Sequence, residues 1–343
     1  MLKKSVLMVV DKYPATYGHT TVINNLCVEL RRLGVKVAIG AFSFDEKPPD
    51  DIEYLKLNRL KLLLSGIDSL EFDIIHSHQT LPNYFLFSRR SSKIKILHYH
   101  GASNMLQRIN FKIFMKLYRN CFTKIISVSN AGISQMKDMI GHVNATVLYN
   151  GVTDEFFTEE ITTHKKGTPQ LLFVSALRKY KQTSVLVNLM SKLLEVFPDA
   201  HLQIVGDGEC LEKLKNQIKI KKLETHVELT GKLDTNKLRK RYSSCDLYIS
   251  ASNFEVCPVP TLEAMACGKP LVLYNIEPHK EIISISKAGE IFSSLESPEI
   301  ISKIKNVYNN RKELGLNGKK FAKQNNWSEV CKKLIGIYED KVD

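Results

Sequence analysis

Short runs of β-branched and other apolar residues alternate with longer segments of helical period along the first 150 residues. Six of these runs are typical of strands: SVLMVV, VKVAIG, FDIIHSH, KIKILHYHG, TKIISVS and ATVLYNG. A segment of helical period over residues 18–34 separates the first two. Strands of this kind, separated by helix-length segments, indicate a parallel sheet covered by helices on both faces. The N-terminal half therefore predicts a doubly wound α/β domain.

Polar residues without a regular period occupy residues 152–169, and we interpret them as a linker. The pattern then starts again, with a helical stretch behind each of six further runs: LLFVSA, AHLQIVG, HVELTG, DLYISAS, PLVLYN and AGEIF. A chain of 343 residues exceeds what one hydrophobic core usually covers. We therefore predict two doubly wound domains, over residues 1–155 and 165–327.

The last segment, NWSEVCKKLIGIYEDKV, predicts an amphipathic helix over about residues 328–343. Trp327 stands at its start, and apolar residues follow at helical spacing at Val330, Leu334, Ile335 and Tyr338. The pattern leaves open which domain the helix packs on, and a return to the N-terminal domain is one of the two possibilities.

The composition restricts the class of protein. The apolar fraction of 43% and the charged fraction of 25% are ordinary for a globular protein, and no window approaches 18 consecutive apolar residues. An integral membrane protein is therefore not predicted. The start MLKKSVLMVV has no small-residue cleavage site behind it, so we interpret it as a strand rather than a signal peptide. Seven scattered cysteines without a C-x-x-C pair favour free thiols in the cytoplasm.

The net charge of +13 is concentrated in the N-terminal half, where residues 1–150 contain 20 Lys and Arg against 11 Asp and Glu. Such an excess favours an anionic partner: nucleic acid, an acidic membrane surface or a phosphorylated substrate. A lysine-rich solvated surface explains the charge equally well. Nucleic acid is the weakest of these interpretations, because the sequence shows no aromatic and basic recognition module.

The stretch FEVCPVPTLEAMACGKP, residues 254–270, carries two glutamates eight positions apart, Glu255 and Glu263. It follows the strand DLYIS, so it predicts a loop and then a helix whose first turn holds the prolines and which ends near Gly268. Two doubly wound domains that face each other place such strand ends around a shared cleft, where open α/β folds bind ligands.

A helix start at such a cleft, here Val259, Pro260 and Thr261, binds phosphate through free N–H groups and the helix dipole. Two carboxylates beside a phosphate repel it. They make better sense as hydrogen-bond acceptors for hydroxyl groups on either side of it. A sugar nucleotide has hydroxyl groups on both sides of its diphosphate.

The E-x7-E spacing within SASNFEVCPVPTLEAMACGKPLV resembles the signature of the retaining glycosyltransferases of family 4, which have the GT-B fold of two facing Rossmann-like domains with a cleft between them. The segments YPATYGH, YHG, LYNGV, QIVGDGE and LTG agree with it in order along nearly the whole chain. The resemblance implies transfer of a sugar from a nucleotide diphosphate sugar, such as a UDP-sugar, to an acceptor hydroxyl with retention of the anomeric configuration. It also implies that no metal or other cofactor is needed.

In similar enzymes the first glutamate holds hydroxyls of the transferred sugar and the second holds the ribose, which implies these roles for Glu255 and Glu263. Exposed glutamates that complement the helix dipole are the alternative. His100 matches the family histidine beside the transferred sugar, although a lone histidine at a strand end is more often simply packed. We interpret His98, His76 and His78 as structural.

The family usually binds the diphosphate with an arginine and a lysine of a G-R-L-x-x-x-K loop, which reads V-S-A-L-R-K-Y-K-Q here. Lys181 matches the lysine, whereas Ala176 stands at the arginine's position. Arg178 either supplies the missing guanidinium or points to solvent. A cation at this place stabilises the charge that grows on the leaving diphosphate.

The resemblance also assigns glycines. Gly18 fits the close approach of the backbone to phosphate and sugar, and His19 replaces a second glycine and is expected to narrow the site or touch the acceptor. Further residues are expected on the nucleotide side: Gly206, Gly208, Gly231 and Lys232. A second glycine pair is replaced by Glu277 and Pro278, while Glu281 still matches a later family acid. Asp207 and Glu209 resemble a metal pair, but we expect them to cap a helix.

Retention raises the question of a nucleophile, since classical retaining glycosidases place two carboxylates about the bond. The resemblance implies front-face attack within an oxocarbenium-like ion pair instead. The acceptor is expected on the basic N-terminal domain, where Arg108, Lys112, Lys116 and Arg119 recur on one helical face. The apolar residues Ile109, Ile113, Phe114 and Leu117 form the other face of this helix.

Such a helix favours docking on the anionic inner face of the cytoplasmic membrane and a lipid-linked or glycan acceptor. A core-packed helix with a solvated basic face is the alternative. Two other functions stay open: a sugar-nucleotide epimerase of the same fold, and an inactive partner subunit, which Ala176 and the missing glycines make more plausible. The residues do not name the sugar, the acceptor or the oligomeric state.

Overall fold

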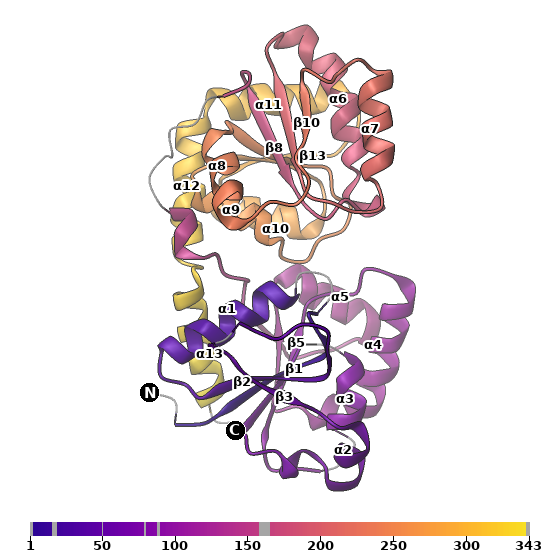
Figure 1. Ribbon diagram of the computed structural model, residues 1–343, viewed down its shortest axis with the longest axis vertical. Helices are drawn as coiled ribbons and strands as arrows, with labels where there is room; N and C mark the ends of the chain where they lie inside the picture. Colours follow the sequence, from indigo (N-terminus) through magenta and orange to yellow (C-terminus); the bar gives the residue numbers. More distant parts are fainter. Residues whose placement is uncertain are drawn as a thin grey trace. The chain divides into compact units, whose positions relative to one another are not determined.

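The chain divides into two compact units, Met1–Gly151 with Trp327–Asp343, and Val152–Asn326. The structure is a computed structural model and describes residues 3–15, 19–49, 51–78, 80–87, 90–157 and 165–340 (Figure 1). The second unit is therefore inserted between Gly151 and the C-terminal helix, which belongs to the first.

The first unit is built on a parallel sheet in the order β3-β2-β1-β4-β5-β6-β7. Its strands are β1 (Val6–Tyr13), β2 (Val37–Phe44), β3 (Glu53–Lys56), β4 (Ile74–Ser77), β5 (Ile94–Tyr99), β6 (Lys124–Ser127) and β7 (Thr146–Val147). The central strands β1 and β4 are almost wholly buried, as strands covered on both faces must be.

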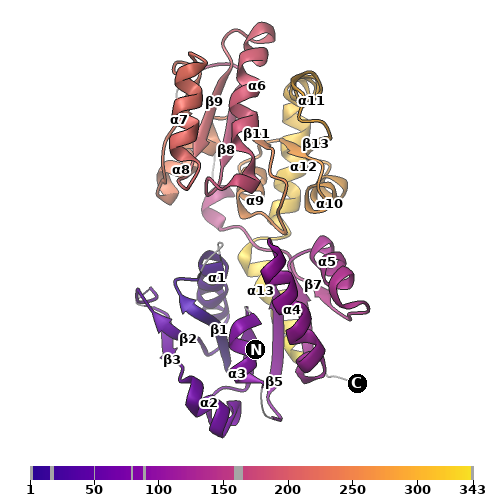
Figure 2. The same ribbon diagram turned by 90° about the vertical axis from the view of Figure 1, so that its right-hand side faces the viewer.

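Helices cover both faces of this sheet (Figure 2). Apolar residues of α1 (His19–Arg32) and α13 (Trp327–Glu339) pack on the face that carries Val6, Met8 and Ile74. The other face, with Leu7, Val9 and Ile75, is covered by a second set of helices. These are α2 (Arg59–Ser65), α3 (Thr80–Leu86), α4 (Met105–Tyr118) and α5 (Asn130–Ile140), with the short 3-10 turns η1 (Ile67–Ser69) and η2 (Arg119–Cys121) between them.

The second unit repeats the architecture, with strand order β10-β9-β8-β11-β12-β13. Its strands are β8 (Gln170–Val174), β9 (His201–Val205), β10 (Val227–Leu229), β11 (Leu247–Ser250), β12 (Leu271–Tyr274) and β13 (Gly289–Phe292). The helices are α6 (Thr183–Val196), α7 (Leu211–Ile220), α8 (Thr235–Ser244), α9 (Val259–Ala266), α10 (Glu277–Ser286), α11 (Ser297–Asn309) and α12 (Arg311–Lys323), with the 3-10 turns η3 (Asp154–Phe157) and η4 (Lys179–Lys181).

In the second unit, α6, α7 and α11 form one apolar layer with the sheet. Opposite them α8 contacts β8, and α9 contacts β11 and β12. Gly268 ends α9 in the left-handed region, at a φ of 68°. Helix α12 comes so close that a Cβ added to Gly315 would lie 2.1 Å from the carbonyl oxygen of Gly268. Glycine at this position therefore fixes how closely α9 and α12 pack.

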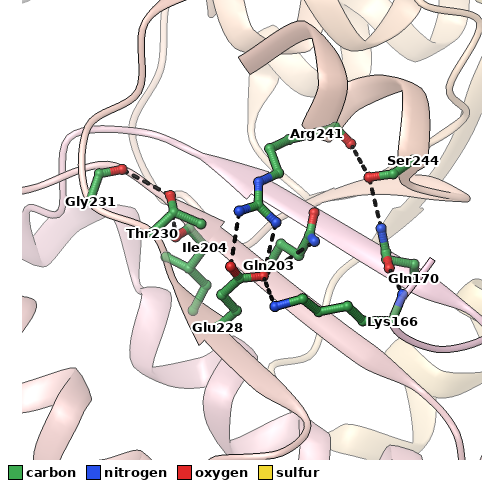
Figure 3. Close-up of polar contacts among 9 residues, drawn as sticks. All are labelled: Lys166, Gln170, Gln203, Ile204, Glu228, Thr230, Gly231, Arg241 and Ser244. Atoms are coloured by element: carbon green, nitrogen blue, oxygen red, sulfur yellow. Dashed lines mark hydrogen bonds and ion pairs between the residues drawn. The ribbon is translucent and has the colours of Figure 1, made fainter. Parts of the chain in front are cut away.

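A polar network ties α8 to the sheet (Figure 3). Arg241 donates two hydrogen bonds, of 3.0 and 2.9 Å, to the carboxylate of Glu228 on β10, and Lys166 forms an ion pair with the same carboxylate at 3.0 Å. One turn further along α8, Gln170 donates to the hydroxyl of Ser244 at 2.9 Å. These contacts hold both ends of the segment that carries Tyr242.

One strand is missing from the sequence prediction. Among the described strands, β3 pairs with β2 alone, at the edge of the first sheet, and most of its residues are exposed. It therefore lacks the apolar run by which the other strands were found. The segment interpreted as a linker contributes more than a connection, because Val152 forms a parallel bridge with Asn326 and η3 packs against α9.

Candidate active site

The carboxyl ends of β8 and β11 meet at the centre of the second sheet, where the strand order changes direction. This is the place where open α/β sheets bind ligands. The amide of Asn253 in the β11 loop donates to the carbonyl oxygen of Tyr180 in the β8 loop at 2.9 Å, which joins the two loops. Both glutamates of the E-x7-E motif, Glu255 and Glu263, follow β11, and Lys181 follows β8.

Lys181 and Glu255 form an ion pair, with Nζ 2.5 Å from Oε1. Their side chains are 12% and 13% exposed, so the pair is poorly hydrated and its attraction is only weakly screened. Gln182 follows Lys181 at a φ of 49°, a left-handed conformation that is unusual for this residue type and common at functional loops. The fold therefore holds the ammonium group and the first glutamate of the motif together.

Glu263 lies on α9 and is partly buried. The hydroxyl of Tyr242 on α8 donates to its Oε2 at 2.9 Å and also lies 3.0 Å from the carbonyl oxygen of Pro260. Burial raises the pKa of Glu263 to about 7, and the bond from Tyr242 offsets only part of this effect. Glu255 and Glu263 thus have different partners, an ammonium group and a phenol.

The start of α9 offers fewer amides than the sequence suggested. Pro260 has no N–H, and the amides of Thr261 and Leu262 both donate to the carbonyl oxygen of Pro258, at 3.1 and 3.4 Å. Of the amides in this first turn, these bonds leave that of Val259 for a ligand. A phosphate at this end would therefore depend on side-chain cations more than on the helix terminus.

In the first unit, His100 follows β5 and shares a hydrogen bond with His78, at 2.9 Å between His100 Nε2 and His78 Nδ1. The ring of His19, the first residue of α1, lies 4.7 Å from that of His100. Burial lowers the pKa of His19 to about 4 and that of His100 well below its usual value. Both rings are therefore neutral near pH 7 and act through hydrogen bonds rather than charge. Gly18 lies outside the described residues.

The sequence model of the family described as Glycosyl transferases group 1 matches residues 154–325, which is half of the chain. The chain belongs to this glycosyltransferase family. A second model, Glycosyltransferase Family 4, matches residues 17–156. The resemblance stated from the E-x7-E motif is thus confirmed.

Relatives of this glycosyltransferase match most or all of its length. It is 26% identical to an uncharacterized glycosyltransferase of Methanocaldococcus jannaschii over all of both chains. It is 23% identical to the phosphatidyl-myo-inositol mannosyltransferase of Mycobacterium leprae over 78% of this chain and 74% of that protein.

Solved structures share its fold. Sucrose-phosphate synthase of Thermosynechococcus elongatus superposes with a TM-score of 0.79 at 15% identity over 98% of both chains. HepE of Anabaena, in complex with UDP, does so with a TM-score of 0.79 at 16% identity over 97% of this chain and 99% of that one. These likenesses confirm the predicted GT-B fold, with two Rossmann-like parallel-sheet units.

The glycines of the β9 loop of this glycosyltransferase allow two backbone segments to approach each other closely. A Cβ on Gly206, at a φ of 134°, would lie 1.8 Å from the carbonyl oxygen of Ser175, and Gly206 also bridges to Gly231. A Cβ on Gly208 would lie 2.8 Å from the carbonyl oxygen of Leu177. These glycines therefore let the β9 loop close onto the β8 loop that leads to Lys181. In the same region, Lys232 is exposed and Arg178 is half-buried.

The expected capping role of Asp207 and Glu209 is wrong. Helix α7 begins after Cys210, and none of the described side chains caps it. Asp207 accepts instead from the amide of Gly208 at 2.7 Å, and Glu209 accepts from the amide of Lys179 at 3.1 Å. Glu209 thereby holds η4, because its carboxylate reaches across to the β8 loop instead of back along its own chain.

The predicted apolar face of α4 is divided in the structure between the core and the surface. Phe111, Phe114 and Met115 are the residues of α4 that are buried. Of the four apolar residues predicted on that face, Phe114 is buried, whereas Ile109, Ile113 and Leu117 are exposed by 45, 51 and 63%. Lys112 and Lys116 are exposed, Arg108 is half-buried, and the exposed Arg119 begins η2 rather than lying on α4.

Two residues of the candidate site escaped the sequence analysis. One is Tyr242, the partner of Glu263. The other is His279 on α10, which is fully buried and has its ring within the electrostatic reach of both Glu255 and Lys181. His279 donates from Nδ1 to the carbonyl oxygen of Tyr274 at 2.8 Å, which leaves Nε2 as an acceptor with no partner among the described residues. Neither residue belongs to a motif, so no pattern in the sequence points to them.

In the described part of the chain, no helix is both long and apolar enough to cross a membrane.

Proposed function

We propose that this glycosyltransferase transfers a sugar from a UDP-sugar to an acceptor hydroxyl with retention of the anomeric configuration. The observation that carries the proposal is the Lys181–Glu255 ion pair at the joined ends of β8 and β11. An ammonium group and a carboxylate side by side match the two parts of a nucleotide sugar that meet at the bond to be broken, the diphosphate and the sugar hydroxyls. The complex of HepE with UDP supports the choice of base.

The residues of the second unit then have distinct roles. Lys181 donates to the leaving diphosphate and takes the part that a divalent metal has in other phosphate sites. Glu255 accepts hydrogen bonds from hydroxyls of the sugar, and Glu263 accepts from the ribose. Tyr242 orients Glu263 for this purpose through the 2.9 Å bond.

The ion pair also supports front-face attack. A carboxylate whose negative charge is held 2.5 Å from an ammonium group is a weak nucleophile, which argues against a covalent intermediate on Glu255. In the front-face route, the bond from the anomeric carbon to the diphosphate oxygen breaks first, and the electron pair leaves with the diphosphate. The acceptor oxygen then bonds to the same face while its proton passes to the leaving phosphate oxygen.

A panel of sugar nucleotides tests this function through slow hydrolysis without acceptor and transfer with it. We expect release of UDP from one donor, and Glu255→Gln should lower the turnover number by about 10²-fold or more. Glu263→Gln should mainly raise the dissociation constant for UDP. Isomerised donor without UDP release would instead identify an epimerase, and a product of inverted configuration by NMR would refute retention. If both variants changed only UDP affinity, the division of roles would be wrong.

The acceptor side of the proposal concerns α4. Leu106, Ile109, Ile113 and Leu117 form an exposed apolar stripe at helical spacing, and Arg108, Lys112 and Lys116 run beside it. An apolar stripe flanked by cations is the pattern of a helix that lies in a membrane interface. We therefore propose that α4 docks on anionic lipid and that the acceptor is lipid-linked, with peripheral attachment to the inner face of the cytoplasmic membrane.

Vesicle sedimentation tests the docking with phosphatidylglycerol and with phosphatidylcholine vesicles. We expect binding to the anionic vesicles only, and loss of that binding in the Lys112→Glu/Lys116→Glu double variant. The matched control is Lys215→Glu/Lys219→Glu on α7, which makes the same charge change in the second unit. Unchanged binding after the α4 substitutions would exclude this helix as the docking surface.

A further inference from the structure

Five histidines of the first unit gather at the carboxyl end of its sheet: His19, His76, His78, His98 and His100. His76 on β4 and His78 are two residues apart, as are His98 on β5 and His100, so each pair points to one face of the sheet. The strand register places His76 beside Ile96, and the face is the one covered by α1 and α13. Three of the five, His76, His78 and His98, are at most 2% exposed.

The three buried rings are packed against one another. The rings of His76 and His78 are stacked with centroids 4.5 Å apart and planes 8° apart, and that of His98 lies 5.2 and 5.1 Å from them. One ring nitrogen can be chosen from each of His76, His78 and His98 such that all three atoms lie within 4.8 Å of one another. A core position of a sheet is usually filled by an aliphatic residue, so three imidazoles here call for a reason.

Hydrogen bonding within the cluster is incomplete. His76 Nδ1 lies 2.5 Å from the hydroxyl of Tyr338, and its Nε2 lies 3.2 Å from His98 Nδ1. Since these two nitrogens face each other, one carries a proton and the other a lone pair. His98 Nε2 is buried and has no partner among the described residues. The cluster therefore does not satisfy all of its own ring nitrogens, which is costly for buried polar atoms.

We propose that His76, His78 and His98 bind a transition-metal cation of the Zn²⁺ class. Zinc–nitrogen bonds of about 2.0–2.1 Å in a tetrahedral site put the ligand nitrogens roughly 3.3 Å apart, close to the 3.2 Å between His76 Nε2 and His98 Nδ1. Imidazole nitrogens select such cations, whereas Mg²⁺ and Ca²⁺ take oxygen ligands.

Whichever ring nitrogen of His78 binds the cation, a candidate for the fourth ligand lies beside it. Its Nε2 lies 3.3 Å from the sulfur of Met8, and its Nδ1 lies 2.9 Å from Nε2 of His100. Tyr338 completes the surroundings, because a metal-binding histidine usually donates its other N–H to an oxygen. Burial lowers the pKa of all three rings, so they are neutral, as metal ligands must be. The cation would be structural, joining β4 and β5 and, through Tyr338, the C-terminal helix.

Calorimetric titration of the chelator-treated full chain with Zn²⁺ tests the site. We expect one ion per chain, at least 100-fold weaker binding in His98→Ala, and a smaller loss of about tenfold in Tyr338→Phe. His201→Ala is the matched control, since His201 in the second unit is also buried and has a ring nitrogen without a partner among the described residues. Equal binding by His98→Ala and the control would overturn the proposal.

X-ray absorption of Zn²⁺ bound to the unaltered chain gives a result that does not depend on how the variants fold. Three imidazole nitrogens in the first shell support the site. A first shell of oxygens, or of thiolate sulfurs from the seven free cysteines, would overturn it, as would the absence of stoichiometric binding.

Discussion

The carboxyl group of Glu263 should make the second unit less stable as the pH rises. Its pKa is raised by burial to about 7, from an ordinary value of 4.5. Between these two values the folded state keeps a proton that the unfolded state has lost, so unfolding releases a proton and is favoured by alkali. The protonated form also gives each of the two hydroxyl groups in this contact, that of Glu263 and that of Tyr242, an acceptor of its own. Glu263 can then donate to Tyr242, whose hydroxyl donates to the carbonyl oxygen of Pro260.

The size of the effect follows from the two pKa values. A difference of about 2.5 units corresponds to roughly 3 kcal/mol when fully developed. Integrated between pH 5 and pH 8, it amounts to about 2 to 3 kcal/mol of lost stability. Glu263→Gln keeps the shape and the neutral charge of the protonated form. The variant should therefore be little different from the parent at pH 5 and more stable by that amount at pH 8.

Hydrogen exchange with mass spectrometry measures the unfolding free energy of the second unit alone, through peptides from β11 and β12 at increasing urea. Comparison of the parent and Glu263→Gln at each pH cancels the contribution of every other titrating group. If the carboxylate that accepts from the ribose is ionised, UDP binding at pH 7 should also release a fraction of a proton. An equal dependence of stability on pH in the two proteins would show that Glu263 is ionised throughout and refute the reasoning.

Three further changes test the geometry. Lys181→Met, Glu255→Gln and the double variant form a cycle in which we expect a coupling of about 1 to 3 kcal/mol in unfolding free energy, and additive effects would deny the ion pair. Gly206→Ala should destabilise the second unit by about 2 kcal/mol or more, because its Cβ would meet a backbone carbonyl, and an unchanged melting temperature would contradict this. Gly151→Ala places a Cβ 2.4 Å from the ring of Trp327, the single tryptophan, so its fluorescence should shift.

Apolar runs predicted the buried strands because parallel strands covered on both faces need them. The same rule explains the failure at β3, whose exposed residues carry no such run. On α4 the sequence holds two apolar stripes, one with Phe111 and Met115 and the other with Ile109 and Ile113. Periodicity alone does not say which stripe meets the sheet, and the structure buries the first.

The candidate site was predictable where a motif spans a short stretch. Spacing and resemblance were enough to identify Glu255, Glu263 and Lys181. Their pairing was not predictable, since Lys181 and Glu255 are 74 residues apart and meet only because β8 and β11 are neighbours. Tyr242 and His279 reach the site through tertiary packing alone. The histidines of β4 and β5 were interpreted as structural from their alternation, which does not predict that their rings stack.

The C-terminal helix determines the order in which the two units can finish folding during synthesis. The core between the first sheet and α1 includes Trp327, Val330 and Leu334, so the first 151 residues leave the ribosome without the helix that closes their own sheet. The inserted residues 152–326 contain all of their own strands and finish earlier. The part of the protein that is made first is therefore the last to fold. Deletion of the final 17 residues should unfold the N-terminal unit and leave the inserted unit folded.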